Sequence, residues 1–428
     1  MVTTKKTTKK KSDEIDYLFV YPTPTIDSPN QLVPLSIIYP GNYYIQKGYN
    51  VKFHDCRFDT DEELYKLVKK AKRLAISSMT GIQCGESARI MIKAKKINPK
   101  IKTILGGYHA TLRKDEVLKE PFVDEVFVGR MGEEYFPYNK HTKYLFDRTA
   151  IQWFTSTGCA HNCSFCCLEH KWNPKPLKQV EHELRTLHKD QKFKYIIFGD
   201  PNLGGDLLRI KKIGEILKDL GVTFHANIRT DYLSPKMVKT LVDANCVSLE
   251  IGCESGDDYV LEHIVYKGHK SDAILKAAKN LRGTGISTMY SFITDMPYET
   301  KKQKRATLNI IDKIHKIDKN ARTSIYGYTP FPNTPMFDMA VKLGYKPPST
   351  MIGWSKIGMS QRPLYWIAGI KFRKDNVRRN FPGLNRLKIL PFEVLSEFMW
   401  RYRITFWYPS KIVEKVIQHA VEKNTVNK

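Results

Sequence analysis

Short apolar runs that alternate with helical segments constrain the fold of this chain more than any other feature. The first series of these runs lies at residues 16–22, 50–55, 74–81, 102–109 and 123–129. Runs that are apolar on both faces are typical of buried strands in parallel sheets, and strands that alternate with helices form doubly wound sheets. We therefore predict an N-terminal, Rossmann-like α/β domain over residues 15–145. Its helices are expected from residue 34 to Gly48, over 61–73 and over 88–97.

A second series of strand–helix units follows the first. Its strands are predicted at residues 151–155, 195–200, 223–229, 247–252, 287–293 and 323–328. Six strands with polar residues after their carboxyl ends indicate a partial (β/α) barrel over residues 146–345, a fold that places its chemistry at those ends. The remaining residues of this 428-residue chain, 346–428, are expected to form a mainly α C-terminal domain.

Three cysteines at the start of the second series indicate an iron–sulfur site. Cys159, Cys163 and Cys166 have the spacing C-x3-C-x2-C. A four-iron cluster normally takes four thiolates, so three of them leave one iron free to bind a substrate or cofactor. Gly158 allows a tight turn before the first ligand. Phe165, between the second and third ligands, is expected to shield the cluster from water.

A zinc site is the alternative for these cysteines. Structural zinc takes four closed ligands, usually as two pairs. No second pair follows, because Cys246 and Cys253 are distant in the sequence and seven residues apart. The spacing therefore favours the cluster, with Cys167 as a bystander.

The pattern C-x3-C-aromatic-x-C resembles the signature of the radical S-adenosylmethionine enzymes. This resemblance implies that the open iron of a [4Fe-4S] cluster chelates S-adenosylmethionine and that an electron from the cluster releases a 5′-deoxyadenosyl radical. It also implies cofactor contacts after later strands. These contacts are Gly199 and Asp200 for the methionine amino group, and Arg229, Glu254 and Ser255 for the ribose and carboxylate.

With this motif downstream, residues 15–145 resemble the cobalamin-binding domain of the class B members of that family. The resemblance lies in residues that follow the third, fourth and fifth strands: Ser77, Ser78, Met79, Thr80, Gly106, Gly107, His109, Gly129 and Glu133. It implies that these residues bind cobalamin, with Met79 and Thr80 under the ring. Many cobalamin proteins supply a histidine from a D-x-H-x-x-G loop. The chain has His54-Asp55-Cys56 instead, so we expect no histidine below the cobalt. A scaffold without cofactor is the alternative for this domain.

The chain carries a net charge of +26, from 70 basic and 44 acidic residues. Residues 1–14 form a basic tail that we expect to be disordered, and residues 346–428 combine basic residues with aromatics. This excess favours an anionic partner. We expect an acidic protein or peptide substrate rather than nucleic acid, for which no motif is recognisable. Peripheral membrane contact and a merely solvated basic surface stay open as alternatives.

The resemblance implies a cobalamin-dependent methyltransferase that acts on an unactivated carbon and receives electrons from a donor such as flavodoxin or ferredoxin. A radical cyclase or ring-forming enzyme acting on a lipid or tetrapyrrole-like substrate is the first alternative. A binding module on an inactive scaffold is the second. Eight cysteines in a chain of this length, three of them clustered, indicate a reducing, cytoplasmic compartment, and no apolar run is long enough for a transmembrane helix.

Overall fold

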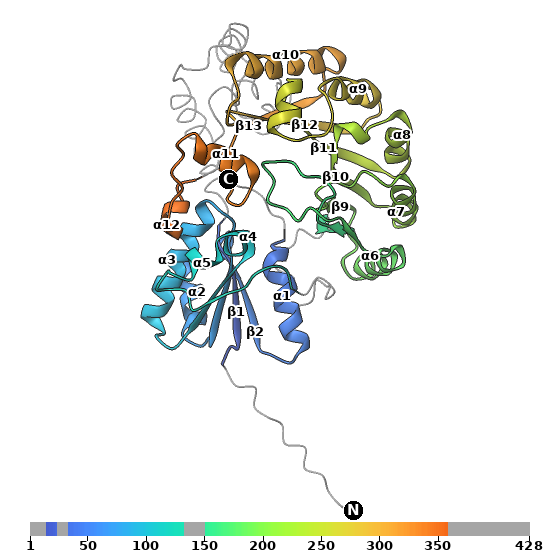
Figure 1. Ribbon diagram of the computed structural model, residues 1–428. Helices are drawn as coiled ribbons and strands as arrows, with labels where there is room; N and C mark the ends of the chain where they lie inside the picture. Colours follow the sequence, from blue (N-terminus) through green and yellow to red (C-terminus); the bar gives the residue numbers. More distant parts are fainter. Residues whose placement is uncertain (1–13, 24–32, 132–149, 358–428) are drawn as a thin grey trace, which may run out of the picture. The chain divides into compact units, whose positions relative to one another are not determined.

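The computed structural model describes residues 14–23, 33–131 and 150–357 (Figure 1). The chain divides into two compact units. The first comprises residues 1–147 and 345–358, and the second comprises residues 148–344 and 359–428. Most of the predicted C-terminal domain, from residue 358 onwards, and the predicted tail up to residue 13 lie outside the described residues.

The first unit contains a five-stranded parallel sheet, as the apolar runs predict. Its strand order is β2-β1-β3-β4-β5. The strands are β1 (Tyr17–Tyr21), β2 (Val51–Asp55), β3 (Arg73–Ser77), β4 (Lys102–Gly106) and β5 (Glu125–Val126). In β1 the adjacent residues Leu18 and Phe19 lie on opposite faces and are both buried, which explains why this strand is apolar on both faces.

Helices cover this sheet, with α1 on one side and α2 and α3 on the other (Figure 1). The helices are α1 (Leu35–Gln46), α2 (Asp61–Val68), α3 (Ile82–Ile97), α4 (Gly107–Leu112) and α5 (Lys114–Val117). Helix α2 begins with a capping box, in which Thr60 and Glu63 satisfy each other's backbone N–H groups.

Several predicted boundaries in this unit were wrong. Helix α2 ends at Val68, because Arg73 already begins the next strand. Helix α3 begins at Ile82, directly after Gly81, which offers no side-chain cap to mark the start. The fifth strand, predicted over residues 123–129, has only two residues. The fourth strand ends at Gly106, at the predicted glycine turn, and α4 follows it.

The strand order creates a switch point between β1 and β3, where ligands bind in doubly wound sheets. Gln83 crosses this point and is almost fully buried. Its Nε2 donates to the carbonyl of Pro22 at 2.9 Å, and its Oε1 accepts from the N–H of Met79 at 2.9 Å. The loop after β3 is therefore fixed to the end of β1.

Helix α12 (Met351–Trp354) also belongs to the first unit, although residues 346–428 are predicted to form a separate domain. Trp354 is fully buried, and its Nε1 donates to Glu116. The N–H of Met351 donates to Glu120 at 2.7 Å. A Cβ added at Gly81 would stand 2.8 Å from the carbonyl oxygen of Ile357, so this segment packs directly on the loop after β3.

The second unit contains the predicted six-stranded parallel sheet, in the order β13-β12-β11-β10-β9-β6. The strands are β6 (Ala150–Trp153), β9 (Tyr195–Phe198), β10 (Thr223–Arg229), β11 (Cys246–Glu254), β12 (Ser287–Thr294) and β13 (Arg322–Gly327). Sequential order without crossing is what a partial (β/α) barrel requires.

Helices follow these strands along the outside of the curved sheet (Figure 1). They are α6 (Leu177–Gln191), α7 (Leu207–Asp219), α8 (Pro235–Asp243), α9 (Asp272–Leu281) and α10 (Lys301–Ile317). Helix α11 (Pro335–Lys342) lies apart from this outer row (Figure 1). Asp206, Ser234, Thr300 and Thr334 each cap a helix start through a side-chain oxygen. Across the described ranges, no helix combines the length and the hydropathy that a membrane crossing needs.

Candidate active site

The cysteines lie on a loop whose base is closed by a short hairpin. Strands β7 (Ser156–Thr157) and β8 (Asn173–Pro174) pair antiparallel on either side of it. Gly158 has φ +67°, and a Cβ there would lie 1.9 Å from the carbonyl oxygen of Lys171. The N–H of Cys159 donates to the carbonyl of Glu169 at 2.9 Å. Only glycine fits at residue 158, because both the backbone conformation and the close approach exclude a side chain.

Asp200 anchors the segment that enters this loop. Its fully buried carboxylate accepts from the N–H of Thr155 at 2.8 Å, the hydroxyl of Thr155 at 2.7 Å and the hydroxyl of Ser156 at 2.6 Å. Burial raises the pKa of Asp200, against these hydrogen bonds. Gly199 lies beside it, and a Cβ there would lie 2.3 Å from the ring of Phe154. The structure therefore gives Gly199 and Asp200 a positioning role next to the cysteines, and their predicted contact with the methionine amino group stays a prediction.

The middle of the cysteine loop is tied to two distant segments through Ser164. Its N–H donates to the carbonyl of Val265 at 2.9 Å, and its hydroxyl donates to the carbonyl of Ile264. Its own carbonyl accepts from the N–H of Met336 at 2.9 Å, at the start of α11. These bonds hold the residue between Cys163 and Cys166 in place without a metal.

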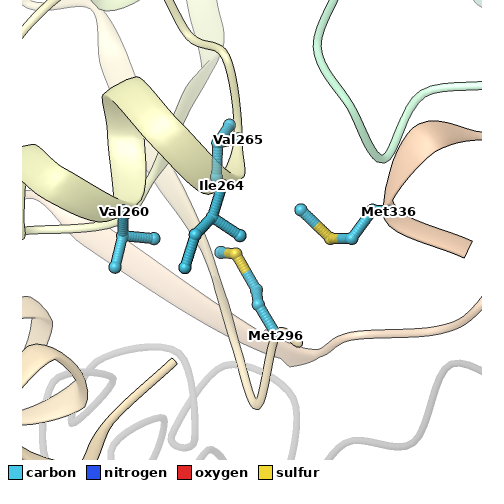
Figure 2. Packing of buried hydrophobic residues seen from close by; sticks show 5 residues of the cluster. All are labelled: Val260, Ile264, Val265, Met296 and Met336. Carbon is cyan, nitrogen blue, oxygen red and sulfur yellow. The ribbon is translucent and has the colours of Figure 1, made fainter. Parts of the chain in front are cut away.

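Next to Ser164 is a buried apolar cluster. It consists of Val260, Ile264, Val265, Met296 and Met336 (Figure 2). Val260 and Ile264 belong to the π-helix η3 (Val260–Ile264), a type of helix that often marks functional sites. Phe165 packs against this cluster. The predicted shielding residue thus has an apolar wall behind it.

The three thiols can serve as ligands. Cys163 is 9% exposed, and Cys159 and Cys166 are half-buried. Burial raises the pKa of Cys163, and it raises that of Cys166 to about 11. These thiols are therefore protonated without metal and lose their protons on binding it.

Among the described residues, no three His, Cys, Asp or Glu side chains converge on a point that could hold a single metal ion. A four-iron cluster does not require such convergence, because each of its thiolates binds a different iron. Three free cysteines on one anchored loop fit a four-iron cluster in this respect.

Two predicted cofactor residues, Arg229 and Glu254, meet near Cys163. Arg229 ends β10, and its Nη1 donates to the Sγ of Cys163 at 3.7 Å. Glu254 ends β11 with φ +63° and accepts from the Nζ of Lys267 at 2.8 Å. Arg229 also donates to the carbonyl of Lys267. Although burial opposes its charge, the carboxylate of Glu254 holds the pKa of Lys267 above its usual value.

Sequence reasoning missed Lys267, because an isolated lysine after an apolar segment has no local signature. Ser255, which was predicted beside Glu254, points elsewhere. It is fully buried, and its hydroxyl lies 3.2 Å from that of Thr307 on α10. Arg229 and Glu254 are thus part of one polar network with Cys163, whereas Ser255 joins the strand end to a helix.

Most of the predicted cobalamin residues lie at the carboxyl ends of β3 and β4. The N–H of Ser78 donates to the carbonyl of Gly106 at 3.0 Å, and the carbonyl of Ser78 accepts from the N–H of His109 at 3.1 Å. Gly107 has φ +88°, and a Cβ there would lie 2.6 Å from the carbonyl oxygen of Ser78. This close approach packs the loop after β4 against the loop after β3, and only glycine permits it.

Side chains at this edge differ in their exposure. Ser78 is buried, Ser77 and Thr80 are half-buried, and Met79 is 50% exposed. Met79 and Thr80 are therefore accessible to a ligand, as their predicted place under the ring requires. Gly129 is exposed with φ +89° and open space beside it. Glu133 lies outside the described residues.

His109 is buried behind Thr80. Its Nδ1 lies 3.1 Å from the hydroxyl of Thr80, and its ring meets that of Trp354 with the centroids 5.6 Å apart. Burial lowers the pKa of His109 to about 4, so the ring is neutral at physiological pH. Its Nε2 has no hydrogen-bond partner among the described residues. His109 therefore orients Thr80, and sequence reasoning missed Trp354 as its support.

Two family models match the chain in the units that carry these residues. Residues 24–136 match the B12 binding domain, and residues 153–311 match the radical SAM superfamily. The chain belongs to the cobalamin-binding (class B) radical S-adenosylmethionine enzymes. A [4Fe-4S] cluster, S-adenosylmethionine and cobalamin are the cofactors typical of this family.

Curated relatives of the enzyme are distant. It is 28% identical over 193 residues to an uncharacterised methyltransferase of Pyrococcus horikoshii, covering 44% of this chain and 41% of that protein. It is 24% identical over 390 residues to the bacteriochlorophyllide d C-8(2)-methyltransferase of Chlorobaculum tepidum, covering 79% of this chain and 82% of that protein. It is 23% identical over 333 residues to the anaerobic magnesium-protoporphyrin IX monomethyl ester cyclase of Rubrivivax gelatinosus, covering 61% of this chain and 56% of that protein. The enzyme thus spans about two fifths of the first relative and just over half of the third.

Solved structures confirm the fold. The cobalamin-dependent S-adenosylmethionine radical enzyme OxsB, with aqua-cobalamin bound, matches with a TM-score of 0.68 at 15% identity, over 95% of this chain and 75% of that chain. The radical S-adenosylmethionine methyltransferase TsrM of Kitasatospora setae matches with a TM-score of 0.59 at 13% identity, over 76% and 77%. At these identities the likeness concerns the fold alone.

Proposed function

We propose that the enzyme is a cobalamin-dependent methyltransferase that acts on an unactivated carbon of its substrate. The observation that carries this proposal is the similarity to the Chlorobaculum tepidum methyltransferase over 390 residues and about four fifths of both chains. Both cofactor-binding regions lie within the part of the chain that the two family models match.

The chain's own residues would hold and orient the cofactors. Cys159, Cys163 and Cys166 would bind the cluster, on a loop held by Gly158 and Ser164. The apolar wall behind Phe165 excludes water from that side. When bound, the cofactors supply a radical that removes a substrate hydrogen and a methyl group that takes its place.

In the first unit, the close approach of Gly107 to Ser78 would hold together the two loops that we expect to bind cobalamin. Thr80, held by His109, would present a fixed hydroxyl beside the exposed Met79. These are the accessible side chains of the loop after β3, so they are the ones that we expect to contact the ring.

Labelled S-adenosylmethionine tests methyl transfer even without a known substrate. The reconstituted enzyme would be incubated with an extract of its native cells and S-adenosylmethionine with a deuterated methyl group. We expect a labelled product, together with S-adenosylhomocysteine and 5′-deoxyadenosine. A Cys163→Ala variant provides the control and should form no 5′-deoxyadenosine. Formation of 5′-deoxyadenosine without any labelled product or S-adenosylhomocysteine would contradict the proposal.

A radical cyclase is the second candidate, supported by the similarity to the Rubrivivax gelatinosus cyclase. The same experiment separates the two functions, because a cyclase would consume S-adenosylmethionine and leave no label in its product. An inactive binding module is disfavoured by the intact set of three free cysteines.

We also propose that the substrate is an acidic protein or peptide and that an electron donor such as flavodoxin or ferredoxin supplies electrons. Residues 346–428 have 16 basic and 5 acidic residues, and most of this segment lies outside the described residues. Charge reversal at Arg378 and Arg379 should raise the substrate KM and spare uncoupled 5′-deoxyadenosine formation. Substrate binding that stays constant as salt increases would contradict this.

A cytoplasmic location also remains a proposal. All eight cysteines are free, as in proteins of reducing compartments. Localisation of the tagged full-length chain by cell fractionation would test it.

A further inference from the structure

The guanidinium of Arg229 is fixed on one side and points at a predicted cluster ligand on the other. Its Nε and Nη2 donate to the two carboxylate oxygens of Asp231 at 3.0 and 3.1 Å. Nη2 also donates to the carbonyl of Lys267. Nη1 is directed at the Sγ of Cys163, 3.7 Å away. Arg229 is only 6% exposed, so these protein contacts account for its environment.

The anchor of this guanidinium is itself held in place. Asp231 lies 3.8 Å from the Nε2 of His269, and that nitrogen is 2.9 Å from the hydroxyl of Thr230. A bidentate arginine–carboxylate pair fixes the plane of the guanidinium as well as its position. The direction of Nη1 toward Cys163 is therefore set by Asp231.

A hydrogen bond and a positive charge at a cluster sulfur have a known electrostatic effect. When one electron enters the cluster from an external reductant, the negative charge at its sulfurs rises. A fixed N–H donor stabilises this reduced form more than the oxidised form, and hydrogen bonds to the sulfurs are among the factors that set the potential.

We propose that Arg229 is a positioning residue of the cluster: it donates a hydrogen bond to the Sγ of Cys163 and thereby raises the reduction potential. The inference requires the cluster and does not depend on methyl transfer. Its residues all lie within the second unit. The proposed effect on the reduction potential does not require a contact between Arg229 and S-adenosylmethionine.

The test is a redox titration of the reconstituted full-length enzyme, followed by electron paramagnetic resonance, without S-adenosylmethionine or substrate. In Arg229→Gln we expect the equilibrium constant for reduction to fall at least tenfold, which corresponds to about 59 mV for one electron. Arg209→Gln is the matched control. Arg209 is also buried in this unit, but it donates to the carbonyls of Lys175 and Thr155. Its loss should leave the potential unchanged.

A double variant separates the hydrogen bond from charge alone. Arg229→Gln leaves the carboxylate of Asp231 without its partner, and this charge would itself lower the potential. Arg229→Gln combined with Asp231→Asn removes both charges, so the potential should still lie below that of the wild type if the sulfur has lost its donor.

Three results would overturn the proposal. The first is a reduction potential equal to that of the wild type in Arg229→Gln or in the double variant, measured on protein whose iron content has been confirmed. The second is an equal fall in Arg209→Gln. The third is loss of iron from both Arg229 variants, because Arg229 would then retain the cluster rather than set its potential.

Discussion

Trp354 meets His109 edge-on, with the two ring centroids 5.6 Å apart, and both side chains are fully buried. His109 in turn holds the hydroxyl of Thr80, one of the accessible residues after β3. A residue from beyond the radical S-adenosylmethionine region thus supports the predicted cobalamin site.

Replacing Trp354 should therefore weaken cobalamin binding. Trp354→Ala removes a fully buried indole and its hydrogen bond to Glu116, and aromatic-to-alanine changes in a core cost about 3–5 kcal/mol. We expect a lower midpoint of thermal unfolding and reduced cobalamin uptake in equilibrium dialysis, with iron content unchanged. Ile352→Ala, at a 54% exposed position of the same helix, is the control. Normal cobalamin uptake by Trp354→Ala would contradict this prediction.

The cluster assignment can be tested by iron analysis. Anaerobically reconstituted enzyme should hold about four irons and four sulfides per chain. Alanine at Cys159, Cys163 or Cys166 should abolish both the cluster and 5′-deoxyadenosine formation, because each thiolate binds a different iron. Cys167→Ala and Cys246→Ala should retain both. Unchanged iron content in Cys163→Ala would refute the assignment.

Bound cobalamin should have no protein histidine below the cobalt. His54 is 2% exposed, and His109 is fully buried with Nδ1 toward Thr80. Neither imidazole is open to a ligand at the carboxyl edge of the sheet. The electron paramagnetic resonance spectrum of the Co(II) form should therefore lack nitrogen coupling from a protein imidazole. Coupling that disappears in His109→Gln would show the opposite.

The stability of the enzyme should depend on pH through His109. Burial lowers its pKa from 6.5 to about 4, so the unfolded chain takes up a proton at a higher pH than the folded chain does. The stabilising contribution of the neutral ring is complete above pH 6.5 and is lost as the pH falls toward 4. At pH 5 the loss is about 2 kcal/mol relative to pH 7.

Chemical denaturation at these two pH values checks this contribution. The difference in unfolding free energy between the wild type and His109→Gln should be smaller at pH 5 than at pH 7. Ile352→Ala, which removes no titratable group from the same unit, is the control and should show no such change. An equal difference at both pH values for His109→Gln would mean that the ring is not held neutral.

Much of the fold could be predicted because local patterns specify it. The strands are short apolar runs. Thr60 and Thr300 each begin a helix with a capping box, which is a local sequence signal. Helix α3 could not be placed in the same way, because its N-cap, Gly81, has no side chain to bond the first turn. Boundaries without a side-chain signal are the ones that were wrong.

The candidate site could be predicted only where a motif carries it. The cysteines are close in sequence, and their spacing alone indicates a cluster. Lys267 could not be found, because its role depends on a buried pairing with Glu254, and the π-helix η3 lies between the two residues in the sequence. Trp354 could not be found either, because Glu116, its partner, lies 238 residues earlier. Contacts of this range leave no local pattern.

The placement of α12 in the first unit also has a consequence for biosynthesis. The ribosome makes β1–β5 first, but the segment that covers Gly81 and His109 is made only after the whole of β6–β13. In the nascent chain, the place beside His109 that the Trp354 ring occupies therefore stays unfilled until residue 357 has left the exit tunnel. The support that Trp354 gives to His109 and Thr80 therefore forms only after translation has passed the cysteine loop.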